Sequence, residues 1–145
     1  MRRVSFLLLA LVVAAGCGGG GSTRLTRDQY AAKADAICGK YSEQLKGLRA
    51  TTLAELVTAV DKAIPVLDNA LTELRKLKPP TDEQATSTQW LAEVETLKAD
   101  VRKIRDKATR NDLAGVAAAA HTAGQDNDKS NQLARQLGMK VCSKG

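Results

Sequence analysis

Hydrophobic residues recur at intervals of three and four along most of the chain, which is the period of an amphipathic α-helix. Polar or helix-breaking residues separate the stretches that show this pattern, which cover about residues 27–49, 53–77, 82–110 and 112–137. Each stretch therefore predicts a helix with one apolar face.

Residues suited to helix N-caps precede all of these stretches. Thr26, Thr52 and Thr81 each have a Gln or Glu three positions later, which is the spacing of a capping box. Asn111 or Asp112 can cap the last helix.

The helix ends are marked by glycine and proline. Gly47 weakens the end of the first helix, Pro79 and Pro80 end the second, and Gly138 stops the fourth. Pro65 lies inside the second helix, where a proline costs about 3 kcal/mol and bends the axis. We expect a kink near Pro65 that is a tolerated bend rather than a hinge or a pocket.

Short connections favour antiparallel neighbours, so the predicted fold is all-α, an up-down antiparallel four-helix bundle over residues 26–142, with a tail at 143–145. Aromatic residues make up only 3% of the chain. The core must therefore consist mainly of aliphatic residues, which suit helix packing better than a β-sandwich.

The N-terminus differs from the rest of the chain. Arg2 and Arg3 precede an uncharged apolar stretch at residues 4–15, which is too short to span a bilayer. This order is typical of a signal peptide, predicted here as residues 1–16.

The residues at the end of this leader, Ala14-Ala15-Gly16-Cys17, resemble a bacterial lipobox, although leucine is commoner at the position of Ala14. The resemblance implies that Cys17 receives a diacylglyceryl group and becomes the mature N-terminus. The alternative is an ordinary signal peptide with an incidental cysteine. Residues 17–25 then form a lipidated cysteine and a Gly/Ser tether.

The chain contains three cysteines. If Cys17 carries lipid, Cys38 and Cys142 remain, and an even number in an exported protein predicts a disulfide. The bridge would require the C-terminal tail to fold back along the first helix, with Cα atoms within about 7 Å of each other. Two free thiols are the alternative, and a zinc site is disfavoured because the chain has one histidine.

The net charge is +6. Outside the membrane, the available anionic partners are lipid headgroups and cell-wall polymers, so we expect no nucleic acid partner. Basic residues line two sides of the late third helix: Lys98, Arg102, Arg105, Lys103, Lys107 and Arg110. This pattern indicates a solvated face more than a lipid-binding face.

No catalytic constellation is recognisable. His121 is the only histidine, no Glu-x-x-His pair occurs, and no Gly-x-Ser-x-Gly motif is present. We therefore expect no enzyme, no metal and no cofactor.

Besides the lipobox, three segments of the chain carry a resemblance to a known group of proteins. They are Ala34–Cys38, Leu74–Leu77 before Pro79-Pro80, and Leu133–Cys142. With them, the chain resembles a group of small uncharacterised lipoproteins from actinobacteria. The resemblance implies a disulfide-closed helical domain on the cell surface and carries no activity.

Two functions remain open for a lipid-anchored domain on the outer face of the cell membrane. The first is a binding module for an envelope protein or a cell-wall component, with a groove near Asn127, Ser130, His121 and Trp90, because polar residues interrupt the apolar face of the fourth helix. The second is a small-molecule carrier with a site between helices near Pro65 and Trp90. Trp90 itself is expected to be a core anchor rather than a ligand platform.

Overall fold

The computed structural model describes residues 24–145. The predicted signal peptide, the lipobox and Cys17 lie outside the described residues. The helices are α1 (Arg27–Leu45), α2 (Leu53–Leu74), α3 (Gln84–Thr109) and α4 (Leu113–Gln136), with short 3-10 helices η1 (Thr81–Glu83) and η2 (Cys142–Lys144).

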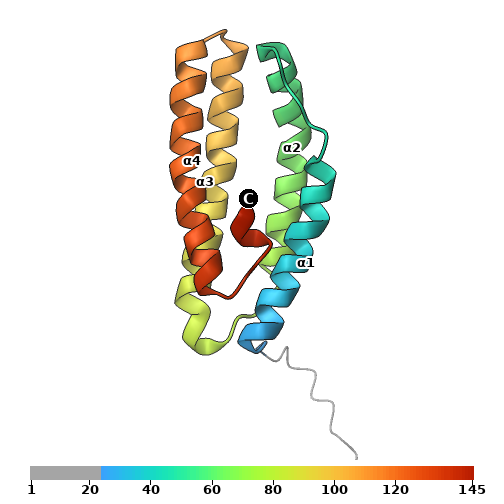
Figure 1. Cartoon of the computed structure of the whole chain (residues 1–145), viewed down its shortest axis with the longest axis vertical. Coiled ribbons are helices and arrows are strands. Elements are labelled where there is room, and N and C mark those ends of the chain that lie inside the picture. The colour runs from blue at the N-terminus through green and yellow to red at the C-terminus, as the bar shows by residue number, and fades with distance from the viewer. Residues whose placement is uncertain (1–23) are drawn as a thin grey trace, which may run out of the picture.

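The predicted all-α bundle is confirmed. Consecutive helices pack against each other in antiparallel order, as Figure 1 shows. The C-terminal η2 packs on both α4 and α1, so the tail folds back between the first and last helices as the cysteine spacing predicted.

Side-chain caps begin three of the four helices. The capping boxes at Thr26 with Gln29 and at Thr52 with Glu55 are both complete. Asp112 caps α4 by accepting a hydrogen bond from the backbone N–H of Gly115 at 2.8 Å.

The prediction for the third helix start was wrong. Thr81 makes no side-chain cap, because residues 81–83 form the 3-10 helix η1 and α3 begins only at Gln84. Pro80 explains this difference, since its backbone is extended at φ −58° and ψ 156° and leads straight into the tighter turn at Thr81.

Two helices end more than one residue earlier than predicted. α1 stops at Leu45 instead of Arg49, because Gly47 takes a left-handed conformation at φ +91°. α2 stops at Leu74 instead of Leu77, where hydrogen bonds from Leu77 to Leu74 and from Lys76 to Glu73 tighten the last turn.

Gly138 ends α4 as predicted. It has φ +79°, and the N–H of Met139 reaches back to the carbonyl of Ala134 at 2.9 Å. This arrangement is a Schellman motif, which turns the chain sharply at a glycine. The turn sends the last residues back toward α1.

Pro65 does not break α2, which runs without interruption past it. The proline is exposed, so its ring lies on the outer side of the bundle. The kink stays a prediction.

The main core lies at the end of the bundle where the described chain begins. Its buried residues come from all four helices and the tail: Tyr30, Ala31, Ala34, Leu74, Trp90, Ala134, Leu137 and Met139. A backbone hydrogen bond from Leu25 to Lys78 joins the segment before α1 to the segment after α2 at this end.

Candidate functional site

The C-terminal tail is fastened to α1 by the predicted disulfide. The Cα atoms of Cys38 and Cys142 lie 5.4 Å apart and their sulfurs are bonded. Disulfides persist in oxidising compartments, so the bridge indicates an extracytoplasmic domain. No helix among residues 24–145 is both long and apolar enough to cross a bilayer.

A carboxylate clamp on α1 holds the same tail. Asp35 accepts backbone hydrogen bonds from Lys140, Val141 and Cys142 at 2.7 to 3.0 Å. Asp35 lies one helical turn before Cys38, so both residues meet the tail from the same face of α1. Sequence reasoning assigned no role to Asp35, although its spacing from Cys38 could have suggested one.

Two amides of α4 hold the last residue. Asn127 and Asn131 donate side-chain hydrogen bonds to the Gly145 carbonyl oxygen at 2.6 and 3.1 Å. These residues are four apart, so their side chains lie on one face of α4. The tail is therefore attached to both α1 and α4 and bridges the space between them.

A cavity of about 210 Å³ lies beside this tail, in the middle of the bundle. All four helices and the tail contribute to its wall. The lining comprises Cys38, Tyr41, Ser42, Leu45, Leu67, Ala70, Leu74, Trp90, Val94, Leu97, Asn127, Ser130, Asn131, Val141, Cys142 and Gly145. Because exposed residues such as Ser42 and Val141 belong to the wall, the cavity reaches the surface beside the tail.

The side chains of the wall are mainly apolar, and none of them is charged. Apolar side chains of α1, α2 and α3, four leucines among them, form much of it, and α4 supplies amide and hydroxyl groups. No Lys, Arg, Asp or Glu stands among the described residues of this wall. The cavity can therefore hold a neutral apolar group near a few hydrogen-bonding groups, the usual composition of a small-molecule site.

The rim of the cavity carries a charged cluster. The Tyr41 hydroxyl donates to Glu73 Oε1 at 2.8 Å, and Lys40 Nζ lies 2.7 Å from the same oxygen. Hydrogen bonds from Lys40 and Tyr41 hold the pKa of Glu73 below its usual value. This cluster fixes the Tyr41 ring, which is part of the wall.

The structure brings together three of the four predicted groove residues. Trp90, Asn127 and Ser130 line this cavity, whereas His121 is exposed on α4 and is absent from its wall. Pro65 and Trp90 are not neighbours in one site. Pro65 lines a separate hollow between α2 and α3 with residues that include Arg102 and Arg105.

Trp90 is a core residue, as expected, and also part of the cavity wall. Its side chain is only 1% exposed and belongs to the main core. The sequence pattern could place Trp90 on the apolar face of α3, but the cavity beside it depends on how the tail packs. Asn131 and Tyr41 were missed for the same reason.

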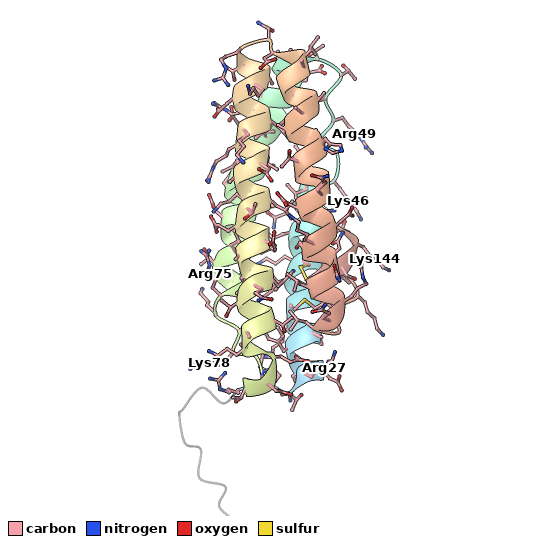
Figure 2. The ribbon with its side chains drawn as sticks, turned by 90° about the vertical axis from the view of Figure 1, so that its left-hand side faces the viewer. Arg27, Lys46, Arg49, Arg75, Lys78 and Lys144 are labelled. Carbon is pink, nitrogen blue, oxygen red and sulfur yellow. A yellow bond between two sulfur atoms is a disulfide. The ribbon has the colours of Figure 1, made fainter. Side chains whose placement is uncertain are left out.

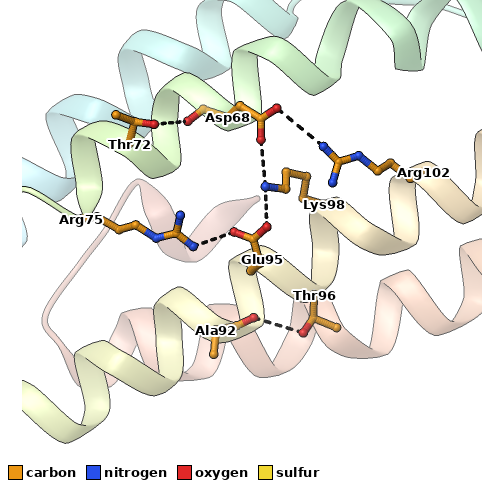
Figure 3. Close-up of polar contacts among 8 residues, drawn as sticks. All are labelled: Asp68, Thr72, Arg75, Ala92, Glu95, Thr96, Lys98 and Arg102. Atoms are coloured by element: carbon orange, nitrogen blue, oxygen red, sulfur yellow. Dashed lines mark hydrogen bonds and ion pairs between the residues drawn. The ribbon is translucent and has the colours of Figure 1, made fainter.

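The basic residues of α3 are nearly all neutralised by neighbouring carboxylates. Lys98 lies between Asp68 on α2 and Glu95 on α3, and Arg102 also reaches Asp68 (Figure 3). Further ion pairs join Lys103 to Asp100, Arg105 to Asp61 and Lys107 to Asp112. These pairs favour the solvated-face interpretation over a lipid-binding face.

Lys98 is the most buried of these cations, at 7% exposure. Its ammonium lies 2.8 Å from Asp68 Oδ1, and Arg75 binds Glu95 at 2.7 Å in the same network (Figure 3). The hydrogen bonds with Asp68 and Glu95 raise the pKa of Lys98 and lower the pKa values of both carboxyl groups. The network ties α2 to α3 on the outside of the cavity.

Other charged side chains are spread along the bundle. Figure 2 shows Arg27 and Lys78 at the end where the described chain begins, and Lys46 and Arg49 toward the other end. No group of three or more His, Cys, Asp or Glu side chains within residues 24–145 is placed to hold a metal ion. The cavity is thus the strongest candidate site in this part of the chain.

Comparison of the chain with models of known protein families, with curated proteins and with solved structures found no match. The family resemblance therefore stays a prediction. What the structure supports is a small all-helical domain with one disulfide.

Proposed function

We propose that this protein is a lipid-anchored binding module outside the cytoplasmic membrane, and that its site is the cavity between the helices. The observation that carries the proposal is the cavity beside the disulfide-held tail, whose lining side chains are mainly apolar and carry no charge. Its volume of about 210 Å³ exceeds the roughly 150 Å³ that accepts benzene in an engineered apolar cavity. The ligand is therefore a small, neutral and largely apolar molecule.

The test is to extract small molecules from protein purified from its native envelope and to identify them by mass spectrometry. The matched variants are Ala70→Phe, which fills the cavity from its α2 wall, and Ala99→Phe, which changes an exposed residue of α3. We expect an apolar compound that accompanies the wild type and Ala99→Phe but is depleted at least tenfold with Ala70→Phe. Equal extracts from all three proteins would contradict the proposal.

The membrane anchor is part of the same proposal. Its support is the lipobox at residues 14–17, together with the disulfide, which fits an exported domain. Intact-mass measurement of the membrane-bound protein should show loss of residues 1–16 and a diacylglyceryl group on Cys17. A chain with an unmodified Cys17, or with Cys17→Ser equally bound to membranes, would refute the anchor.

A second candidate function is docking of an envelope protein or cell-wall polymer, as the sequence suggested. The observation in its favour is the half of the bundle beyond Leu45, where α1 no longer covers the other helices. Leu113 is 68% exposed there, and Ile64 and Val116 are only half-buried. A photo-crosslinker at position 113 should then capture one defined envelope component, whereas one at exposed Gln132 should not.

A further inference from the structure

A hollow at the end of the bundle where the described chain begins combines basic and apolar side chains. Its volume of about 390 Å³ falls within the range of about 300–1,000 Å³ that is usual for ligand pockets. The wall is formed by the segment before α1, the segment after α2 and the first turns of α3, and its main contributors are Arg24, Leu77, Lys78, Gln84, Thr88 and Leu91. It shares no residue with the cavity between the helices, so it is a separate candidate site.

Arg24 is well placed in this wall to bind an anion. Its segment is fixed, because the Leu25 N–H donates to the Lys78 carbonyl oxygen at 2.9 Å. The Arg24 guanidinium donates to the Pro79 carbonyl oxygen at 3.1 Å, and no carboxylate within residues 24–145 pairs with it. Since a guanidinium has five N–H donors, Arg24 keeps donors and its full positive charge for a ligand. The planar fork of these donors fits the oxygens of a phosphate group.

The charges around the hollow favour an anionic ligand. Its wall contains no Asp or Glu among the described residues, and the neighbouring Glu83 is paired with Arg27 at 3.0 Å. The segments that form this end, 24–28, 75–84 and 135–140, contain seven Lys or Arg and three Asp or Glu residues. Segments 49–55 and 106–116 at the opposite end contain three of each. Anions should therefore concentrate at the end where Figure 2 shows Arg27 and Lys78.

The same end must lie close to the membrane if Cys17 carries lipid. Arg24 comes seven positions after Cys17 in the sequence, and seven residues span at most about 25 Å in any conformation. The opposite end is farther away by the length of α3, whose 26 residues extend over roughly 39 Å. Phospholipid headgroups are thus within reach of the hollow at all times, at the high effective concentration that a short tether creates.

We propose that this hollow binds the phosphate group of an anionic phospholipid, and that the bundle therefore stands on the membrane with this end. The inference rests on the proposed lipid anchor. Arg24 and Lys78 bind the phosphate oxygens, and the Gln84 side-chain amide donates a further hydrogen bond. Leu77 and Leu91 are half-buried in the same wall and contact the glycerol and the first methylene groups. A phospholipid fits this mixed surface better than an inorganic phosphate does.

The test is a vesicle sedimentation assay with the full mature chain, residues 17–145, in which Cys17→Ser prevents lipid attachment. Vesicles of phosphatidylcholine alone are compared with vesicles of phosphatidylcholine and phosphatidylglycerol in equal parts. The salt concentration is about 0.1 M, at which charges more than about 10 Å apart are largely screened. The chain should bind the anionic vesicles and not the neutral ones. Absence of binding to the anionic vesicles, or equal binding to both kinds, would overturn the proposal.

Matched variants separate the hollow from the general charge of this end. Arg24→Gln removes a cation of the wall, and Arg135→Gln removes an exposed cation of the same end that lies outside the wall. One cation near an anionic surface contributes a factor of about five to binding, so Arg24→Gln should weaken vesicle binding about fivefold and Arg135→Gln less than about twofold. Equal losses would mean a diffuse attraction and would overturn the assignment to the hollow.

A second pair of variants tests the hollow without a change in charge. Thr88→Phe fills it from α3, whereas Gln89→Phe places the same side chain at an exposed neighbouring position outside the wall. Thr88→Phe should bind the anionic vesicles about fivefold more weakly than Gln89→Phe, because a blocked hollow separates the phosphate from Arg24. Equal binding of these two variants would contradict a headgroup in the hollow.

Two further comparisons distinguish the lipid from other phosphates and the headgroup site from the anchor. Tighter binding of the chain to soluble glycerol phosphate than to the vesicles, or binding to a phosphate-containing cell-wall polymer but not to vesicles, would overturn the lipid assignment. Because the tested chain carries no lipid, its binding to vesicles is independent of the anchor. An unmodified Cys17 in the intact-mass measurement, with vesicle binding retained, would refute the anchor alone. The reverse result would refute the headgroup site alone.

Discussion

The two halves of this bundle carry similar apolar stripes but bury them to different extents. In the half that contains Tyr30 and Leu137, four helices and the tail surround a closed core. In the other half, α2, α3 and α4 continue without α1, and among the large apolar residues there only Val60 is buried. The difference shows that an apolar stripe predicts a helix face, whereas its burial depends on whether a partner helix reaches it.

The cavity lies where these halves meet. Leu45 is both the last residue of α1 and part of the cavity wall, and the tail from Val141 onward forms another part. The short α1 thus leaves space in the bundle, and the disulfide-held tail fills only some of it. The candidate site therefore lies at the boundary between the closed half and the open half of the bundle.

Removal of the disulfide should cause the largest loss of stability, because the bridge fastens the tail that closes one half of the bundle. The bridge spans 104 positions of the chain, and a loop of that size is worth about 4 to 5 kcal/mol in the chain-entropy model. Cys38→Ser/Cys142→Ser should lose about that much free energy of unfolding in urea titration under oxidising conditions. An unchanged unfolding midpoint would show that the tail does not close the core.

The next prediction compares the loss of stability caused by the same substitution, leucine to alanine, in each half of the bundle. Leu137 is 1% exposed in the closed half, so Leu137→Ala should lose about 2 to 5 kcal/mol of stability. Leu113→Ala, at an exposed position of the open half, should change it by less than about 0.5 kcal/mol. Equal losses in urea unfolding would mean that both halves are packed alike in solution.

A smaller effect should follow from removing the carboxylate clamp. Asp35→Ala takes the acceptor from three backbone N–H groups of the tail, so we expect a loss of about 1 to 3 kcal/mol. Hydrogen exchange should accelerate at residues 140–142 more than in the rest of the core. Lys33→Ala, an exposed substitution on the same helix, is the control and should leave these amides protected.

The smallest effect concerns the ion-pair network around Lys98. The folded-state pKa values of Asp68 and Glu95 are lowered, chiefly by hydrogen bonds from Lys98. Their stabilising contribution is therefore present above the unfolded values of about 3.9 and 4.3, and it is lost as pH falls through the lowered values.

Wild-type stability should accordingly decrease between pH 5 and pH 3. Lys98→Met should show a smaller decrease over this range, because the cation that lowers both pKa values is gone. Parallel pH curves for the two proteins, measured by thermal unfolding, would contradict the assigned role of Lys98.

Local signals in the sequence predicted much of the fold. The caps at Thr26 and Thr52 and the stop at Gly138 depend on residues close to each other in the chain, and they were predicted correctly. The Cys38–Cys142 bridge followed from the number of cysteines rather than from geometry. These features need no knowledge of tertiary packing.

The site could be predicted only in part. The polar interruptions at Asn127 and Ser130 indicated incomplete burial, and both line the cavity. The Asp35 clamp and the contribution of Asn131 were missed, because they depend on the path of the tail after Gly138. The capping box expected at Thr81 failed because the adjacent prolines favour a 3-10 turn.

The most direct test of the account is a crystal structure of the protein purified from its native envelope. We predict a small, neutral and largely apolar compound in the cavity between the four helices and the tail. A structure in which neighbouring side chains fill this space completely would contradict the account.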